Sequence, residues 1–260
     1  MSKNEKVAVI SDIHSNPKAF LNVLDDAEKQ GCTRIICLGD IVGYGYDPNA
    51  CIEICRDRNI ECVLGNHDAG LVGKLSLEWF NSFAANAVLR QMDEVTDDNK
   101  EWLDSLDYNI REDFGAWSVC FAHATFSDPA EFGYINGPGD AVFESTIMSS
   151  GKCDVLFVGH THYAETYAFD VDRNIFNFYT YNSPDLTINL NNYATTIINV
   201  GSVGYPRNQD GSFYCIFDVD EQMVHYRKLP FDFDSLINEM EKRNLTLPMW
   251  LKEKKGKINK

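Results

Sequence analysis

KVAVISDIHSNPKAFLNVLDDAEKQGCTRIICLG, residues 6–39, decides the fold of this chain. Its two ends are short apolar runs of strand length, and residues 17–30 between them carry apolar side chains at helical spacing. Residues 48–58 and 60–65 repeat the same order of helix and strand. Strand–helix–strand units of this kind predict a parallel sheet with helices packed outside it.

The rest of the chain has a less regular pattern. Residues 76–106 predict two helices with no strand between them, and we interpret residues 71–107 as a small helical insertion that caps the ligand edge of the sheet. Strand patterns return at residues 117–122 and 154–159. Four later segments predict an antiparallel or mixed second sheet, namely residues 164–169, 194–200, 212–219 and 223–229.

Composition predicts one globular domain over residues 1–250, followed by a mobile basic tail over residues 251–260. The formal net charge of −16 disfavours duplex nucleic acid and anionic membranes as partners. No apolar run has the roughly 18 residues that span a bilayer, and no secretory signal is visible. With eight cysteines and no CxxC pair, we expect a cytoplasmic protein with reduced thiols. The oligomeric state stays open, a homo-oligomer included.

Side chains able to bind metals follow five of the predicted strands, at the point where each strand ends. They are Asp12 and His14, then Asp40, then Asn66 with His67 and Asp68, then His123, and finally His160 with His162. Taken singly, each has a structural explanation, such as a capping aspartate or a turn-forming asparagine. The set as a whole favours a metal site, because it contains five of the six histidines and the carboxyl ends of parallel strands share one edge of a sheet.

This mixture of carboxylate, imidazole and amide oxygen, without thiolate, suits Mn, Fe, Co, Ni or Zn as divalent ions. The candidate ligands are too many for one tetrahedral ion, so we expect two ions about 3.5–4 Å apart. A carboxylate has two oxygens and can bridge two ions, and Asp40 lies in the middle of the set along the chain. The sequence therefore predicts a centre of two divalent metals, with manganese favoured.

The ordered motifs Asp12-x-His14, Gly39-Asp40-x-x-Gly43, Gly65-Asn66-His67-Asp68, His123 and Gly159-His160-x-His162 resemble the signature of the calcineurin-like metallophosphoesterases. Residues 201–207, GSVGYPR, are similar to a segment of the small bacterial and archaeal members. The resemblance implies an α/β fold, a four-layer α/β/β/α sandwich of two packed mixed sheets flanked by helices. It also implies three ligand sets: Asp12, His14 and His162 on one ion, Asn66, His123 and His160 on the other, and Asp40 on both.

The resemblance implies a hydrolase that cleaves a small phosphoester by attack of a hydroxide that bridges the two metals. The substrate would be a phosphodiester, a nucleotide or a dinucleoside polyphosphate. His67 would polarise the phosphoryl group or protonate the leaving oxygen, and Asp68 would orient His67. Residues 40–45 lack the DRG triplet of the protein serine/threonine phosphatases, which argues against a phosphoprotein substrate. The alternative is a non-catalytic scaffold for protein partners, which the complete ligand set disfavours.

Two further assignments stay open. Arg207 contacts a substrate phosphate in one interpretation, and fixes the loop at residues 201–204 through an ion pair in the other. Trp79, Phe80 and Asn86 line a base-binding cleft in one interpretation. The other, which the sequence favours for the Trp-Phe pair, makes those two rings part of the core.

Overall fold

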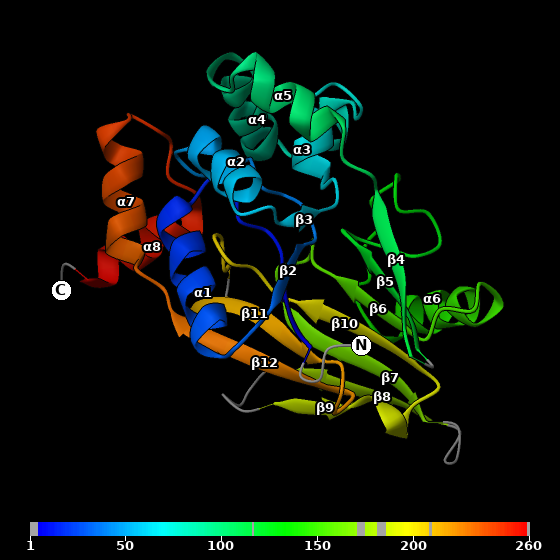
Figure 1. The fold of residues 1–260 in the computed structure, drawn as a ribbon. Helices are drawn as coiled ribbons and strands as arrows, with labels where there is room; N and C mark the ends of the chain where they lie inside the picture. Colours follow the sequence, from blue (N-terminus) through cyan, green and yellow to red (C-terminus); the bar gives the residue numbers. More distant parts are fainter. Residues whose placement is uncertain (1–4, 116, 171–174, 181–185, 208–209, 259–260) are drawn as a thin grey trace.

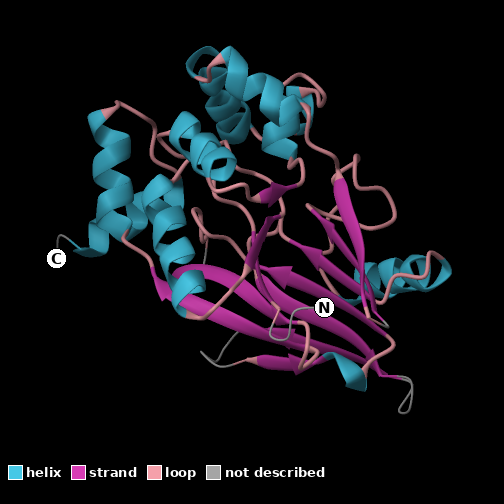
Figure 2. Cartoon of the chain, in the orientation of Figure 1, coloured by secondary structure: helices cyan, strands magenta, loops and turns pink. Residues whose placement is uncertain are grey.

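Two six-stranded sheets form the centre of the molecule (Figures 1 and 2). The computed structural model describes residues 5–115, 117–170, 175–180, 186–207 and 210–258. The first sheet has the order β3 (Glu61–Cys62), β2 (Arg34–Cys37), β1 (Lys6–Ile10), β11 (Gly211–Asp218), β12 (Met223–Pro230) and β9 (Thr187–Asn189). The second has the order β4 (Asn109–Phe114), β5 (Trp117–Ala122), β6 (Val155–Val158), β10 (Thr195–Val200), β7 (Ala164–Asp170) and β8 (Ile175–Thr180).

The predicted parallel strands are present, but the assignment of the later strands to a second sheet is wrong in part. Strands β1, β2 and β3 pair in parallel, and so do β5, β6 and β10. Strand β11 pairs antiparallel with β1, and β12 continues the same sheet. Every residue of β11 is buried, so both of its faces are covered by the rest of the protein. Such a pattern identifies a central strand but not the sheet that contains it.

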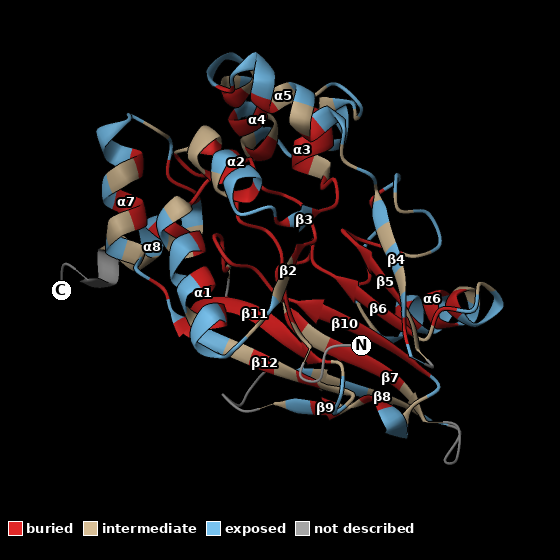
Figure 3. Ribbon diagram, viewed as in Figure 1, coloured by how far each residue is buried: buried red, intermediate tan, exposed pale blue. Residues whose placement is uncertain are grey.

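Helices cover the outer face of each sheet. In β1, Val7 and Val9 face the second sheet, whereas Ala8 and Ile10 face the helices. Helices α1 (Pro17–Lys29) and α2 (Pro48–Asp57) pack on that outer face, and α7 (Phe233–Lys242) lies beside α1. Helix α6 (Pro138–Ser150) packs on the outer face of the second sheet. Figure 3 shows the buried residues concentrated in the sheets, and the predicted four-layer α/β/β/α arrangement is confirmed.

The segment predicted as an insertion forms a group of helices above α2, at the edge of the first sheet (Figure 1). It contains the short 3₁₀ turn η1 (Leu77–Trp79), α4 (Ser82–Glu94) and α5 (Asp97–Asp104), and it follows α3 (Asn66–Leu71). We call residues 71–107 the helical cap. The first of its two predicted helices is interrupted, because the side chain of Asn81 accepts a hydrogen bond from the Ala84 N–H and starts α4 there.

The carboxyl-terminal segment is helical where a mobile tail is predicted. Helix α8 (Met249–Ile258) covers most of residues 251–260, and residues 259–260 lie outside the described part of the chain. Leu251 is fully buried in an apolar cluster with Leu236 and Met240 of α7, so this contact holds the start of α8 against the domain. No described helix combines the length and the apolar composition that crossing a bilayer requires.

Candidate active site

Loops from both sheets bring the predicted metal ligands together. The loops after β1, β2 and β3 carry four of them, and the loops after β5 and β6 carry three. The sequence predicts a single shared sheet edge, whereas the structure joins the edges of two packed sheets. We call the seven residues the ligand cluster: Asp12, His14, Asp40, Asn66, His123, His160 and His162.

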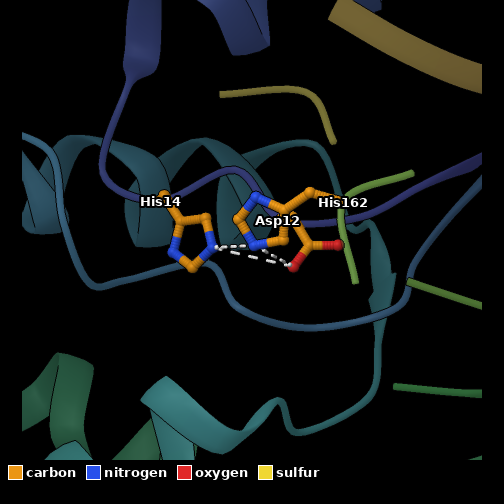
Figure 4. A group of neighbouring side chains, drawn as sticks. All are labelled: Asp12, His14 and His162. Atoms are coloured by element: carbon orange, nitrogen blue, oxygen red, sulfur yellow. Dashed lines mark hydrogen bonds and ion pairs between the residues drawn. The ribbon is translucent and has the colours of Figure 1, made fainter. Parts of the chain in front are cut away.

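Asp12, His14 and His162 form one half of the ligand cluster (Figure 4). Asp12 Oδ1 lies 3.2 Å from His162 Nε2 and 3.6 Å from His14 Nε2. The two Nε2 atoms of His14 and His162 are 3.1 Å apart. The three atoms thus surround a common point, as the ligands of one ion would.

The second half is built around His123. Its Nε2 atom lies 3.1 Å from Asn66 Oδ1, 3.2 Å from His160 Nδ1 and 3.4 Å from Asp40 Oδ2. The same Oδ2 atom of Asp40 lies 3.6 Å from His14 Nε2 in the first half. Asp40 therefore joins the two halves, which is the position expected of a bridging carboxylate.

Backbone carbonyls fix the proton of three of these imidazoles. Because a carbonyl can only accept, each ring's Nδ1 carries a hydrogen, and when the ring is neutral its Nε2 presents a lone pair to the cluster. The pairs are His14 with Val42 at 3.0 Å, His123 with Leu38 at 2.7 Å and His162 with Tyr205 at 2.7 Å. Two lone pairs 3.1 Å apart, on His14 and His162, repel each other unless a cation lies between them. This donor arrangement fits metal ions.

The buried charges of the ligand cluster also favour metal binding. Asp12 and Asp40 are at most 1% exposed. Burial alone would raise the pKa of each carboxyl, but the nearby imidazoles, foremost His162 for Asp12 and His123 for Asp40, hold both below their ordinary range. Burial opposes protonation of His123, yet Asp40 raises its pKa to about 9. Two ionised carboxylates in a buried site require cations, and divalent metals meet that requirement.

Five residues of the ligand cluster have an unusual backbone. The φ angles are 55° at Asp12, 47° at His14, 52° at Asp40, 65° at His160 and 68° at His162. This left-handed region is uncommon for residues other than glycine and costs roughly 1–2 kcal/mol each. Such conformations concentrate at functional sites, where the surrounding structure enforces them.

Gly159 allows the two sheets to meet at the ligand cluster. A Cβ atom at this position would lie 2.0 Å from Ser11 Oγ and 2.5 Å from Asp12 Oδ2. The next residue, His160, donates its backbone N–H to Asp12 Oδ2 at 3.1 Å. The loop after β6 therefore approaches the loop after β1 as closely as it does only because residue 159 has no side chain.

His67 lies beside Asp40 with its ring buried. Its backbone N–H donates to Asp40 Oδ1 at 2.8 Å, and its ring meets the edge of Phe80 at a centroid distance of 5.2 Å. A Cβ atom on Gly43 would lie 2.2 Å from His67 Nδ1, so this glycine makes room for the ring. Burial lowers the pKa of His67 to about 3, although Asp40 opposes the shift.

The expected contact of Asp68 with His67 is replaced by another set of partners. The Asp68 carboxylate accepts the backbone N–H groups of Val42 at 3.0 Å, Gly65 at 3.1 Å and Ile41 at 3.3 Å. The two residues are neighbours in the first turn of α3, where consecutive side chains point in different directions. Asp68 therefore fixes the loop after Asp40 and does not orient the His67 ring.

A cavity of about 340 Å³ opens onto the ligand cluster. Arg207 lines it, and its guanidinium donates to the Tyr44 hydroxyl at 3.4 Å. Trp79 and Phe80 also line it, while Asn86 lines a separate cavity on the other side of α4. The core interpretation is wrong for Trp79, which is 82% exposed, whereas Phe80 is partly buried against the core.

Two residues near the site are not among those the sequence analysis selects. Gln91 is fully buried and contacts the loops that carry His14 and Asp40. The signal for it is its position, because it continues the buried stripe Ala84, Ala87, Val88 of α4 with a polar side chain. Tyr134 stacks on the His160 ring at a centroid distance of 4.0 Å, and no pattern in its own segment predicts this contact.

Comparison with known proteins identifies a protein family whose members resemble this chain. The model of the calcineurin-like phosphoesterase superfamily domain matches residues 6–222. An uncharacterised protein of Methanocaldococcus jannaschii is 36% identical over 249 residues, which cover 95% of this chain and 96% of that protein. A crystal structure of a metallophosphoesterase from Sphaerobacter thermophilus matches with a TM-score of 0.77 and 29% identity, over 95% of this chain and 96% of that one. A hypothetical protein of Pyrococcus horikoshii shares the fold, with a TM-score of 0.73 at 16% identity and 95% coverage of both chains.

Proposed function

The chain belongs to the calcineurin-like phosphoesterase superfamily, and we propose that it hydrolyses a small phosphoester with the help of two divalent metal ions. The observation that carries this proposal is the ligand cluster itself. Lone pairs of His14 and His162 face each other at 3.1 Å, and Asp40 joins this pair to His123. A cluster of this kind is unfavourable without cations and well suited to them.

Each half of the ligand cluster would hold one ion, with Asp40 between the two. The ligand sets are Asp12, His14 and His162 for one ion and Asn66, His123 and His160 for the other. Mixed nitrogen and oxygen ligands accept Mn, Fe, Co, Ni or Zn, among which we favour manganese. When bound, the two cations supply a water of lowered pKa as the nucleophile and neutralise charge on the phosphate.

The chain's own groups then act on the substrate. His67 faces the cavity, and its ring, neutral because burial lowers its pKa to about 3, donates a hydrogen bond that polarises the phosphoryl group or the leaving oxygen. Its position depends on the backbone hydrogen bond to Asp40 and on the space left by Gly43. Arg207 lines the same cavity and binds a phosphate oxygen. The cavity volume of about 340 Å³ supports a small substrate.

We also propose a reducing compartment, the cytoplasm, as the place of action. All eight cysteines are free thiols in the structure, and seven of them are buried. Burial raises the pKa of Cys37 and Cys51 well above the ordinary value, so these thiols stay protonated and unreactive. A structural rather than a catalytic role follows for them.

Hydrolysis of bis-p-nitrophenyl phosphate with Mn²⁺ tests the proposed function. We expect turnover that EDTA abolishes, and a loss of about 10²–10⁴-fold in kcat for His67→Ala with both ions still bound, as measured by metal analysis. The matched control is His225→Ala. His225 lies on β12 outside the ligand cluster, where it contacts Thr187 Oγ1 at 3.1 Å, and its loss should leave the rate unchanged.

Two results would contradict the proposal. One is a protein that binds metal ions but shows no metal-dependent turnover with monoesters, cyclic nucleotides, dinucleoside polyphosphates or linear diesters, which would favour the scaffold alternative. The other is a His67→Ala variant with undiminished turnover, which would remove His67 from the reaction.

A further inference from the structure

Two exposed aromatic rings line the cavity beside the ligand cluster, and the proposed reaction does not use them. Trp79 of η1 is 82% exposed and Tyr134 of the β5–α6 loop is 51% exposed. Both residues line the cavity of about 340 Å³. They come from separate segments of the chain, one from the helical cap and one from the second sheet, so the cavity has aromatic side chains from two directions.

Packing does not explain the position of Trp79. Its indole belongs to none of the apolar clusters that the described residues form, whereas its neighbours Leu77 and Phe80 both pack against the core. Leaving a large aromatic side chain in water forgoes about 1.5–3 kcal/mol of burial free energy. An exposed aromatic side chain on the wall of a cavity is typical of a ligand contact.

The position of the Tyr134 ring is fixed by a contact with a residue of the ligand cluster. Its ring stacks on that of His160, with 4.0 Å between centroids and 27° between planes. One face of the phenol ring is thus occupied by a member of the ligand cluster, and the side chain is still half exposed. The contact sets the ring at a fixed distance from the place where a phosphate would bind.

We propose that the substrate carries a planar aromatic ring, as a nucleotide does, and that Trp79 and Tyr134 bind this ring. This inference rests on the proposed function, because it assigns the phosphate of the same molecule to the ligand cluster and to Arg207. The cavity has the volume of a small-molecule site, and its lining combines charged groups such as Asp40 and Arg207 with the aromatic rings of Trp79 and Tyr134. The helical cap then selects the substrate.

Stacking selects substrates that carry a flat aromatic ring, but it does not distinguish one nucleobase from another. Every nucleobase offers a flat face, so an indole and a phenol ring accept purines and pyrimidines alike. Ring-free phosphoesters such as sugar phosphates retain the phosphate contacts and lose the stacking. The expected preference is for nucleotides over sugar phosphates, at about tenfold or more in affinity.

Binding of AMP and of ribose 5-phosphate to the Mn²⁺-loaded protein tests this inference, in a His67→Ala background that keeps both ions and slows turnover. Both ligands carry the same phosphate, so the ratio of their Kd values, measured by isothermal titration and by tryptophan fluorescence, isolates the ring. We expect AMP to bind about tenfold more tightly, which corresponds to about 1.4 kcal/mol. Trp79→Ala should reduce this ratio toward one, and Trp79→Phe should retain most of it because it keeps a ring.

Leu89→Ala is the matched control, since Leu89 is an exposed apolar residue of the same cap that does not line the cavity. Equal affinities for the two ligands in the metal-loaded protein that keeps Trp79, or equal ratios in Trp79→Ala and Trp79→Phe, would overturn the inference. So would the absence of measurable binding by either ligand. If AMP binds through Trp79 but no phosphoester is hydrolysed with Mn²⁺, the proposed function fails and the ring site remains.

Discussion

Gln91→Leu should destabilise the protein and loosen the metal site, although residue 91 touches no metal ligand directly. Gln91 is fully buried in α4. Its Oε1 accepts the Gly43 N–H at 2.6 Å, and its Nε2 donates to Ser15 Oγ at 3.0 Å. One side chain of the helical cap therefore joins the loop after β1 to the loop after β2, and those loops carry His14 and Asp40.

The expected loss follows from the groups left without partners. Leucine has a similar size but cannot bond to the Gly43 N–H or to the Ser15 hydroxyl, both of which are buried. Each unsatisfied buried group costs about 1–3 kcal/mol, and the added apolar burial returns roughly 1 kcal/mol. We expect the free energy of unfolding to fall by about 1–5 kcal/mol.

Urea unfolding gives this number directly, as a lower midpoint at an unchanged slope. The matched control is Asn86→Leu, the same exchange of amide for leucine on the exposed face of the same helix. Mn²⁺ binding should also weaken, because His14 Nδ1 donates to Val42 O, next to Gly43. A Gln91→Leu protein within about 0.5 kcal/mol of the parent, with Mn²⁺ affinity intact, would refute this account of the cap.

Three further outcomes are expected. Gly159→Ala should abolish binding of at least one Mn²⁺ ion in equilibrium dialysis, because the new Cβ would lie 2.5 Å from Asp12 Oδ2; retained stoichiometry would contradict the close approach. Mn²⁺ at 100 times its Kd should stabilise the protein by about 2.7 kcal/mol for each bound ion in thermal unfolding, EDTA should reverse the gain, and Asp40→Asn should lose most of it. Burial opposes ionisation of Asp26, but two hydrogen bonds from Arg227, at 2.9 and 3.0 Å, lower its pKa below the ordinary value. Its stabilisation is therefore complete above about pH 4 and is lost as the pH falls through the lowered pKa, so unfolding curves of the parent and Asp26→Asn should converge as the pH falls below about 4.

The layers and the ligand cluster can be predicted from the sequence because both depend on short local patterns. Apolar runs such as residues 6–10 and 155–158 are buried on both faces, and they end where a polar side chain begins. Histidine is scarce in this chain, so five of the six at strand ends stand out from the background. Each ligand is identified by its place after a strand, which needs no knowledge of distant contacts.

Elements whose structure depends on tertiary contacts cannot be predicted from these local sequence patterns. Strand β4 reads NIREDF, with three consecutive charged residues between Ile110 and Phe114, and it is a strand because it pairs with β5 at the sheet edge. Helix α6 has no marked apolar face, and its position comes from the packing of Ala141 and Met148 against the second sheet. The role of Asp68 is missed for the same reason, since its partners are backbone groups 26 and 27 residues away.

The left-handed backbone at five residues of the ligand cluster affects what a substitution there removes. Alanine at Asp12 or His160 takes away a ligand atom and also imposes a residue that resists a φ of 55° or 65°. Asparagine adopts that conformation more readily than other residues with a side chain, so it changes the donor and largely spares the turn. Natural variants of this chain that give up a metal would accordingly be expected to carry asparagine or glycine at these positions, with the loops otherwise intact.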